Sequence, residues 1–177
     1  PEASQGGDLG LVWSDQPGTT TLTLSAYRTD YQELIQYGPT FAFENIARAR
    51  IQGLEGSLEG MTGSFRRSLA YAYTNPKNLE TGLRLARRPK HKVTASVGFE
   101  KGRVVAQARV TGVFDRDGSP FDLNKPNDYV VSSLSASVKT PGGVRIGVRA
   151  ENLGDYVYED VPGYTTPPRA GYLTAAS

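Results

Sequence analysis

The chain has 177 residues, and its 20 Lys and Arg against 18 Asp and Glu leave a net charge of +2, too little surplus to predict a nucleic-acid partner. Only 38% of the residues are hydrophobic and the mean hydropathy is −0.42, which is lean for a soluble globule with one apolar interior. The absence of cysteine excludes disulfide bonds and cysteine-ligated metals.

Apolar and polar residues alternate along nearly the whole chain. The alternation predicts nine strands, in chain order residues 8–14, 19–31, 46–60, 64–74, 90–100, 103–114, 128–139, 143–152 and 170–176. Period-2 alternation repeated so often predicts an all-β fold, an antiparallel meander of about nine strands with one apolar and one polar face. No helix of useful length is predicted.

The third strand breaks the strict alternation. Ala49 and Ile51 occupy odd positions, whereas Leu54 and Leu58 occupy even ones. An extra residue in one strand shifts every following side chain to the other face. The sequence therefore predicts a β-bulge at Gly53.

Short and long connections alternate between the predicted strands. Residues 60–63, 100–102 and 140–143 are short glycine-containing turns, whereas residues 73–88 and 114–128 are long and polar. This rhythm is typical of outer-membrane barrels, which have short turns on one side and long loops on the other. No apolar stretch approaches the roughly 20 residues of a membrane helix, but a barrel strand needs only about 9–11.

Four groups of residues form motifs that follow one another in a fixed order. They are Tyr27, Tyr31, Leu34 and Ile35; Asn45, Ala49, Ile51, Gly53 and Glu55; Arg87, Pro89 and His91; and Asn152, Leu153, Asp155, Tyr158, Gly163, Tyr164 and Arg169. This series resembles the strands and the C-terminal end of TonB-dependent outer-membrane receptors. The segment ARIQGLEG is similar to the corresponding segment of vitamin B12 receptors. Siderophore receptors share these motifs.

The resemblance implies a fold, a location and a function. Residues 1–177 would be the C-terminal segment of a larger transmembrane barrel of 22 strands, with the plug domain and the N-terminal strands absent. The complete protein would import a large scarce solute, a cobalamin or an iron-siderophore, through the bacterial outer membrane. Its partners would be outer-membrane lipid, a corrinoid or iron-chelate ligand, and TonB, which would bind through the absent plug and TonB box.

The resemblance also implies roles for individual residues. Gly53 would absorb the bulge, Glu55 would point into the aqueous lumen, and Asn152 would cap backbone groups at a strand end. Leu153, Asp155, Tyr158 and Arg169 would belong to the same structural ending. External loops near residues 36–45, 75–88, 115–127 and 155–168 would shape the outer mouth. The aromatic residues expected to contact ligand are Tyr37, Phe41, Phe121 and Tyr164.

Two features depart from the family pattern. Pro167-Pro168-Arg169 stands where Pro-Gly-Arg is usual, and the chain stops at Ala175-Ala176-Ser177 where an aromatic residue is usual. We therefore expect a shortened or altered final strand. Nine strands of such a wall leave two open edges, so we expect the chain expressed by itself to aggregate.

Two other architectures remain open at this point: a small closed barrel acting as a pore or adhesin, and a soluble β-sandwich binding module. Catalysis is not predicted, because the single histidine, His91, stands between two lysines without a positioned partner. Calcium binding is not predicted either. The acidic residues of the 114–128 segment, Asp115, Asp117, Asp122 and Asp128, lack the spacing of a calcium loop. The sequence thus indicates no enzyme, metal or cofactor.

Overall fold

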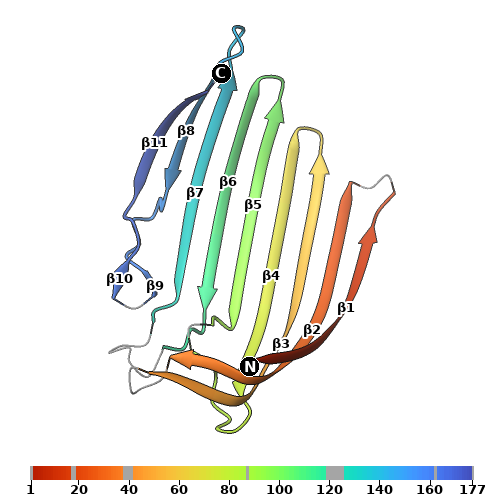
Figure 1. The fold of residues 1–177 in the computed structure, drawn as a ribbon. Helices are drawn as coiled ribbons and strands as arrows, with labels where there is room; N and C mark the ends of the chain where they lie inside the picture. Colours follow the sequence, from red (N-terminus) through yellow and green to blue (C-terminus); the bar gives the residue numbers. More distant parts are fainter. Residues whose placement is uncertain are drawn as a thin grey trace.

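The computed structural model describes residues 2–16, 19–37, 42–86, 88–118, 126–161 and 163–176. Nine strands form one antiparallel sheet, in the spatial order β1 (Ala3–Ser14), β2 (Thr20–Tyr37), β3 (Phe43–Thr62), β4 (Phe65–Asn78), β5 (His91–Lys101), β6 (Val104–Phe114), β7 (Tyr129–Lys139), β8 (Arg145–Glu151) and β11 (Ala170–Ala176) (Figure 1). The predicted all-β meander is confirmed. Within the described ranges, no helix is long and apolar enough to cross a membrane.

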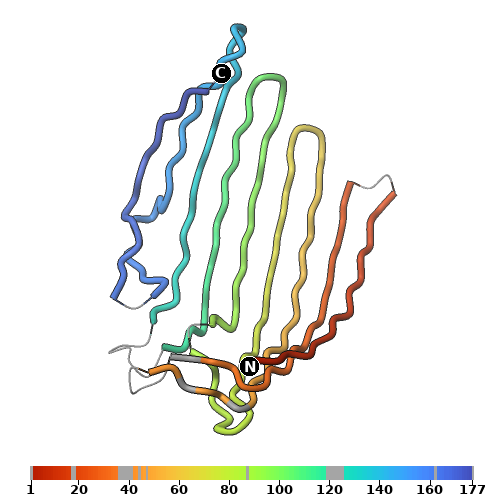
Figure 2. The backbone as a smooth tube through the Cα atoms, in the orientation of Figure 1, coloured from red at the N-terminus to blue at the C-terminus, as the bar shows by residue number. Residues whose placement is uncertain are grey.

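Two further strands, β9 (Glu159–Val161) and β10 (Tyr164–Thr165), pair with each other inside the last long connection. The sequence predicts a loop in this segment and gives no indication of the small hairpin. Gly163 lies between the two strands with φ = +86°, a left-handed conformation that glycine adopts without steric cost. In Figure 2 the hairpin lies at the lower end of the sheet, beside the ends of the longer strands.

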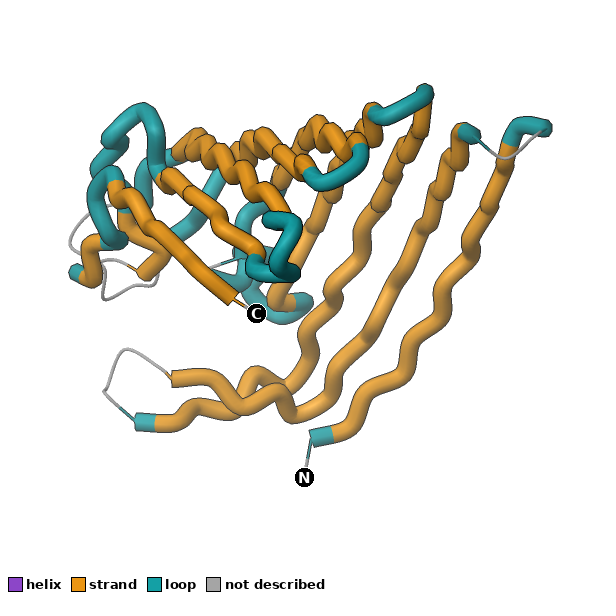
Figure 3. Tube along the Cα trace, turned by 90° about the horizontal axis from the view of Figure 1, so that it is seen from above, coloured by secondary structure: helices purple, strands orange, loops and turns teal. Residues whose placement is uncertain are grey.

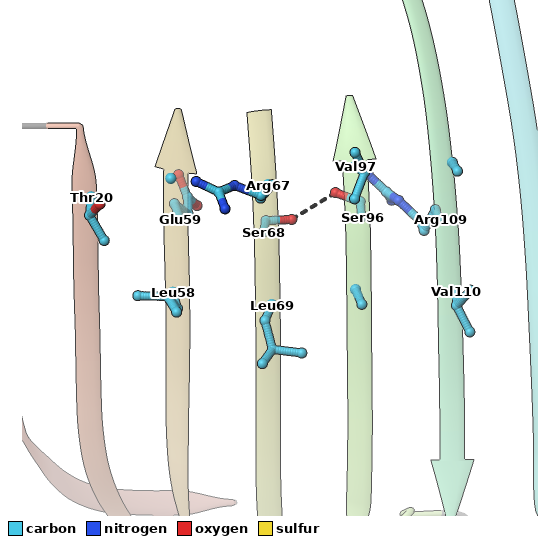
Figure 4. A pocket seen from close by; sticks show the side chains of 13 residues that line it. Thr20, Leu58, Glu59, Arg67, Ser68, Leu69, Ser96, Val97, Arg109 and Val110 are labelled. Carbon is cyan, nitrogen blue, oxygen red and sulfur yellow. Dashed lines mark hydrogen bonds between the residues drawn. The ribbon is translucent and has the colours of Figure 1, made fainter. Parts of the chain in front are cut away.

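Strand register separates an apolar face from a polar face. On the apolar face Leu58 of β3 lies opposite Leu22 of β2 and Leu69 of β4. On the polar face Ser68 of β4 lies opposite Ser96 of β5, and their hydroxyl oxygens are 2.7 Å apart in a hydrogen bond (Figure 4). Antiparallel pairing keeps each type of side chain in continuous rows across the sheet.

The apolar face lies open in the described structure. Leu9 is 78% exposed and Leu173 is 77% exposed, although both lie in regular strands. The strands follow one curved wall (Figure 3). A β-sandwich would bury such residues between two sheets, so this alternative is wrong. A closed small barrel does not describe the chain either, because β1 and β11 are the outer strands of the sheet order.

The predicted bulge at Gly53 is wrong. The register runs without a shift from Tyr27 through Gly53 to Thr74. Glycine is needed for a different reason: a Cβ built there would lie 2.2 Å from the carbonyl oxygen of Tyr73 and 2.7 Å from the Tyr27 hydroxyl. The Tyr27 hydroxyl crosses the strand at this point and forms a hydrogen bond of 3.1 Å with the Thr74 hydroxyl.

A small buried cluster explains the changed alternation of β3. Ala49 is fully buried and Leu85, from the β4–β5 connection, is 4% exposed in the same cluster, with Ile51 packed against them. Ala49 and Ile51 lie on the polar face of the sheet by register. They are apolar because the β4–β5 connection folds over that face and covers them.

The strands extend further towards the long connections than alternation predicts. β1 begins at Ala3 rather than residue 8, β2 runs to Tyr37 rather than residue 31, and β4 runs to Asn78 rather than residue 74. Figures 1 and 2 show β2 and β3 bending strongly at this end. Glu33 has φ = +55° there, a left-handed backbone conformation that is uncommon for a residue other than glycine. Polar extensions of this kind carry little hydrophobic signal.

Candidate functional site

Three long connections, β4–β5, β6–β7 and β8–β11, follow strands that end on the same side of the sheet as β2 does, and we call this side the long-loop end; it is the candidate site. The strand ends that these connections join lie at the lower end of Figure 1. The short turns lie at the other end, where Gly63, Gly102 and Gly143 adopt positive φ. The predicted alternation of short and long connections is confirmed.

An ionic network joins the β4–β5 and β6–β7 connections. Arg84 donates to Asp115 at 2.8 Å and also pairs with Asp117, and the ammonium of Lys90 lies 3.4 Å from Asp115. The hydrogen bond from Arg84 is the largest influence lowering the pKa of Asp115 to about 2. The same bond raises the pKa of Arg84. Two of the acids weighed for calcium therefore hold an arginine.

Arg116 is the most strongly enclosed cation of this end, with 7% exposure. Its guanidinium donates to the carbonyl oxygens of Asn127 at 3.0 Å, Glu159 at 2.7 Å and Asp160 at 2.6 Å. It also lies over the ring of Tyr129, 5.2 Å from the centroid. A planar guanidinium can reach several carbonyls at once, so Arg116 fastens the β9–β10 hairpin to the β6–β7 connection.

Aromatic side chains add to this attachment. The rings of Tyr129 and Tyr158 have centroids 4.2 Å apart, and the Tyr129 hydroxyl donates to the Asp160 carboxylate at 2.6 Å. The Tyr156 hydroxyl donates to the Asp128 carbonyl at 3.3 Å. The last long connection is therefore held as a defined structure against its neighbour.

Asn152 lies where β8 ends and organises the C-terminal motif. It is 7% exposed with φ = +49°, and its side-chain amide donates to the carbonyl of Tyr156 at 2.9 Å and accepts from the Tyr156 N–H at 3.0 Å. Asp155 accepts from the Arg169 N–H at 2.9 Å. The motif thus closes the two ends of the long connection onto each other.

The remaining motif residues lie apart from this closure. The Leu153 N–H donates to the Ser132 carbonyl at 3.0 Å while its side chain is 38% exposed. Glu55 lies in mid-strand opposite Ser25 and Ala72, on the polar face of the sheet. Gly53 lies two residues before it on the same face.

The four aromatic residues expected to contact ligand are described unequally. Tyr164 lies in β10 and is 75% exposed. Tyr37 ends β2, but its side chain lies outside the described part of the chain, and so do Phe41 and Phe121. The sequence pattern does not predict the roles of Arg84 and Arg116, because their partners come from distant segments. The DRD triplet around Arg116 is the one local signal, because an arginine between two aspartates suggests paired charges.

A depression of about 480 Å³ lies across β2–β6 towards the short-turn end. Figure 4 shows its lining as neighbouring positions on adjacent antiparallel strands, with Leu58, Leu69 and Val110 in one row and the Ser68–Ser96 bond in another. Its residues come from both faces of the sheet. The depression is therefore part of the uneven surface of the sheet itself, and it is separate from the long-loop end.

Residues 1–153 match the family described as "TonB dependent receptor-like, beta-barrel". The chain belongs to this family. It is therefore an outer-membrane chain, and its apolar face is the one that a barrel turns towards lipid. The family consists of receptors and transporters.

Solved structures share the fold of this TonB-dependent receptor chain. The copper transporter OprC is 21% identical with a TM-score of 0.80, over 99% of this chain and 32% of OprC. The ferric-catecholate import receptor Fiu from E. coli K12 is 18% identical with a TM-score of 0.78, over 99% of this chain and 27% of Fiu. The siderophore receptor PiuA from Acinetobacter baumannii is 18% identical with a TM-score of 0.78, over 97% and 28%. The chain thus spans about a third or less of each of these proteins.

Proposed function

We propose that this chain is the C-terminal part of a TonB-dependent transporter that imports a large scarce solute, with an iron-siderophore favoured over a cobalamin. The family match over residues 1–153 is the observation that carries the proposal. Fiu and PiuA are named as receptors for iron carriers, which supports an iron chelate. The similarity of ARIQGLEG to vitamin B12 receptors favours a corrinoid instead and keeps cobalamin as the second candidate.

The arrangement of the long-loop end supports a role in capturing solute. Arg116 and Asn152 hold the last connection in a defined shape, and Tyr164 projects from it with 75% exposure. A rigid support with an exposed aromatic side chain is a common way to present a contact to a ligand. We assign Tyr37, Phe41 and Phe121 to the same outer mouth from their sequence positions.

Transport requires parts outside this sheet. In our proposal a plug domain fills the barrel, TonB binds the plug through a TonB box, and residues 1–177 supply wall and external loops. The wall is passive in energy transfer. It holds the external loops in register and provides a lumen lined by residues such as Glu55.

The proposal is tested with the complete receptor in a bacterial strain that lacks its own copy. Uptake of ⁵⁵Fe bound to catecholate and hydroxamate siderophores is measured with and without TonB, and labelled cobalamin and copper serve as parallel substrates. We expect TonB-dependent uptake of at least one ferric siderophore. Uptake that does not depend on TonB, or no uptake from the whole panel, would overturn the proposal.

A loop variant sharpens the same assay. Replacing Tyr164 with Ala removes an exposed ring that takes no part in the contacts of Arg116 and Asn152 described above, whereas Tyr172→Ala removes a ring on the wall strand β11 as the control. We expect Tyr164→Ala to raise the half-saturation concentration for uptake several-fold, since stacking of one aromatic ring contributes about 1 kcal/mol.

A further inference from the structure

An arginine lies inside the apolar outer face, near the short-turn end. Arg67 of β4 is exposed and shares this face with Leu69, two residues nearer the middle of the strand. Two residues nearer the turn lies Phe65, whose ring centroid is 5.1 Å from that of Phe99. Apolar rows therefore flank the cation on both sides. A charged side chain on the lipid-facing side of a barrel is unfavourable, the more so nearer the bilayer midplane, so Arg67 needs a compensating partner.

The guanidinium of Arg67 is directed towards the short-turn end. Its Nη2 donates to the Thr62 hydroxyl at 2.7 Å, and Thr62 lies one outward row nearer the turn on β3. The side chain reaches from β4 towards β3 (Figure 4), next to Gly60, where an added Cβ would lie 3.9 Å from Nη2. Among the described residues Thr62 is its one hydrogen-bond partner, and no carboxylate pairs with it. A guanidinium has five N–H donors, so capacity is left for an anion.

The depression across β2–β6 adjoins this arginine. Two alanines on neighbouring strands, Ala95 and Ala108, lie near its centre, and their register partners are Val110 and Val97. A methyl group fills less space than the leucine side chains of β3 and β4 beside it, so the outer face is hollowed here. The apolar residues of the lining all belong to outward positions: Leu58, Leu69, Ala95, Val97, Ala108 and Val110.

The hollow extends from Arg67 towards the middle of the bilayer. Its lining covers the row of Arg67 and the next row, that of Leu69. Successive outward rows are about 7 Å apart along a strand, or about 5 Å along the membrane normal for a tilt of about 45°. Outer-membrane barrels have short turns on the periplasmic side and aromatic girdles at the interfaces. Arg67, one row inside the Phe65–Phe99 pair, therefore lies at the boundary between headgroups and acyl chains of the periplasmic leaflet.

We propose that Arg67 and this hollow bind one glycerophospholipid of the periplasmic leaflet, with its phosphate on the guanidinium and one acyl chain in the hollow. A guanidinium matches phosphate oxygens in charge and geometry. An apolar hollow directly beside a cation matches an amphiphile whose phosphate is joined to its acyl chains. Phosphatidylglycerol and phosphatidylethanolamine share the phosphodiester, which is the group that Arg67 contacts. This inference goes beyond solute import and depends on the family and on the outward direction of the apolar face.

The test uses the complete receptor, delipidated in neutral detergent and examined by native mass spectrometry. The probes are dioleoyl phosphatidylglycerol, dioleoyl phosphatidylethanolamine and dioleoylglycerol, which lacks the phosphate. Arg67→Gln removes the cation, and Lys101→Gln, on the same face at the β5–β6 turn and outside the hollow, is its matched control. Ala95→Leu fills the hollow, and Ala136→Leu, at an outward position of β7 outside the hollow, is the second control.

We expect Arg67→Gln to bind phospholipid about fivefold more weakly, which corresponds to the roughly 1 kcal/mol of one cation at a lipid surface. Ala95→Leu should weaken binding by at least as much, because the larger side chain occupies the space of the acyl chain. Both control variants should bind like the parent protein, and dioleoylglycerol should bind weakly to all of them. Equal losses in a variant and its control, or equally strong binding of dioleoylglycerol, would overturn the site.

The two phospholipids separate the sources of the phosphate. Binding of both by the parent protein supports a site that contacts the phosphodiester alone, whereas binding of phosphatidylglycerol only supports a site that also requires net negative charge. A receptor dimer that carries no lipid and is lost in Ala95→Leu would assign the hollow to a second copy of the receptor and contradict the proposal.

Two further measurements keep the result interpretable. Heat-modifiable gel migration establishes that each variant is folded. Solute uptake is measured separately, so failure of the lipid site leaves the transport proposal standing, and failure of transport leaves the lipid result standing.

Discussion

The strand wall and the long-loop end of this molecule are stabilised in different ways. In the wall, the same interactions repeat from strand to strand. The backbones pair in continuous register, with apolar rows of side chains on one face and polar rows on the other. At the long-loop end, a few individual side chains hold segments that are far apart in sequence, as Arg116 does for the hairpin at Glu159 and Asp160. The wall therefore tolerates many substitutions, whereas the loop end depends on single residues.

The two regions also differ in what a glycine does. In the short turns of the wall, Gly102 has φ = +61° with nothing near its Cβ position, so it serves backbone conformation. In mid-strand, Gly53 is needed for a different reason: the Tyr27 side chain and the Tyr73 carbonyl oxygen leave no room for a Cβ atom. Gly53 is thus a position where the otherwise tolerant wall becomes specific, because the atom nearest to its Cβ position belongs to the backbone.

The largest effect is expected at that exception. Gly53→Ala places a methyl group 2.2 Å from a backbone carbonyl that pairing holds in place, so we expect a loss of about 3 kcal/mol in the free energy of unfolding. Gly10→Ala is the matched control, since its nearest neighbour would be 3.8 Å away, and it should change stability by less than about 0.5 kcal/mol. Urea titration of the vesicle-embedded receptor, followed by gel migration, measures both. Equal midpoints for the two variants would contradict the crowding at Gly53.

The next largest effect is expected for Arg116→Gln. The variant loses charge-assisted bonds to three carbonyls, and we expect opening of the β9–β10 hairpin to become easier by about 2 kcal/mol while global unfolding changes little. Hydrogen exchange of the amides at residues 156–166 measures the opening. Arg103→Gln, at the exposed β5–β6 turn, should leave that exchange unaltered. Fast exchange in both variants would remove Arg116 from its role.

A smaller effect with two separable parts is expected at Asn152. Asn152→Gly keeps the positive φ but loses the bonds to Tyr156, which should cost about 1 kcal/mol. Asn152→Ala adds the cost of a left-handed backbone, about 1 kcal/mol more. Denaturant midpoints of the two variants give the two contributions. If glycine and alanine behaved alike, backbone conformation would have no part in the closure.

The smallest effect is a pH dependence confined to the loops. Because pairing with Arg84 lowers the pKa of Asp115 to about 2, the folded loop favours the ionised form. The contribution is complete above the ordinary carboxyl pKa near 4 and is lost as pH falls through about 2. Hydrogen exchange around residues 84–90 should therefore rise between pH 4 and pH 2, and Asp115→Asn should abolish this rise. A rise that persists in the variant would place the titrating group elsewhere.

The sequence predicts the wall well because the wall is periodic. Alternation identifies all nine strands of the sheet and both faces, since one buried or lipid-facing side imposes period 2 on every strand. It misplaces the ends of β1, β2 and β4, where polar residues continue to pair beyond the apolar band. The misplaced bulge at Gly53 arises because Ala49 and Ile51 are covered by Leu85, a contact from another segment.

The sequence predicts the loop end poorly for the same physical reason. Arg116 is bonded to residues 43 and 44 positions away, and Arg84 to one 31 positions away, so no local pattern records these contacts. Asn152 and Asp155 are recognised because their partners are a few residues away or at the other end of one connection. The presumed contribution of Tyr37, Phe41 and Phe121 to ligand contact stays a prediction.

The central claim is that the apolar face of this sheet meets lipid and the polar face meets water. This chain contains no cysteine, and single cysteines at Leu69, Ala70, Tyr71 and Ala72 of β4 can each carry a spin label in a complete receptor whose remaining sequence is made free of cysteine, in bilayers. Accessibility to oxygen and to a water-soluble nickel complex is measured at each position. We expect oxygen to dominate at residues 69 and 71 and nickel at residues 70 and 72. The same accessibility at all four positions, or the opposite alternation, would contradict the account.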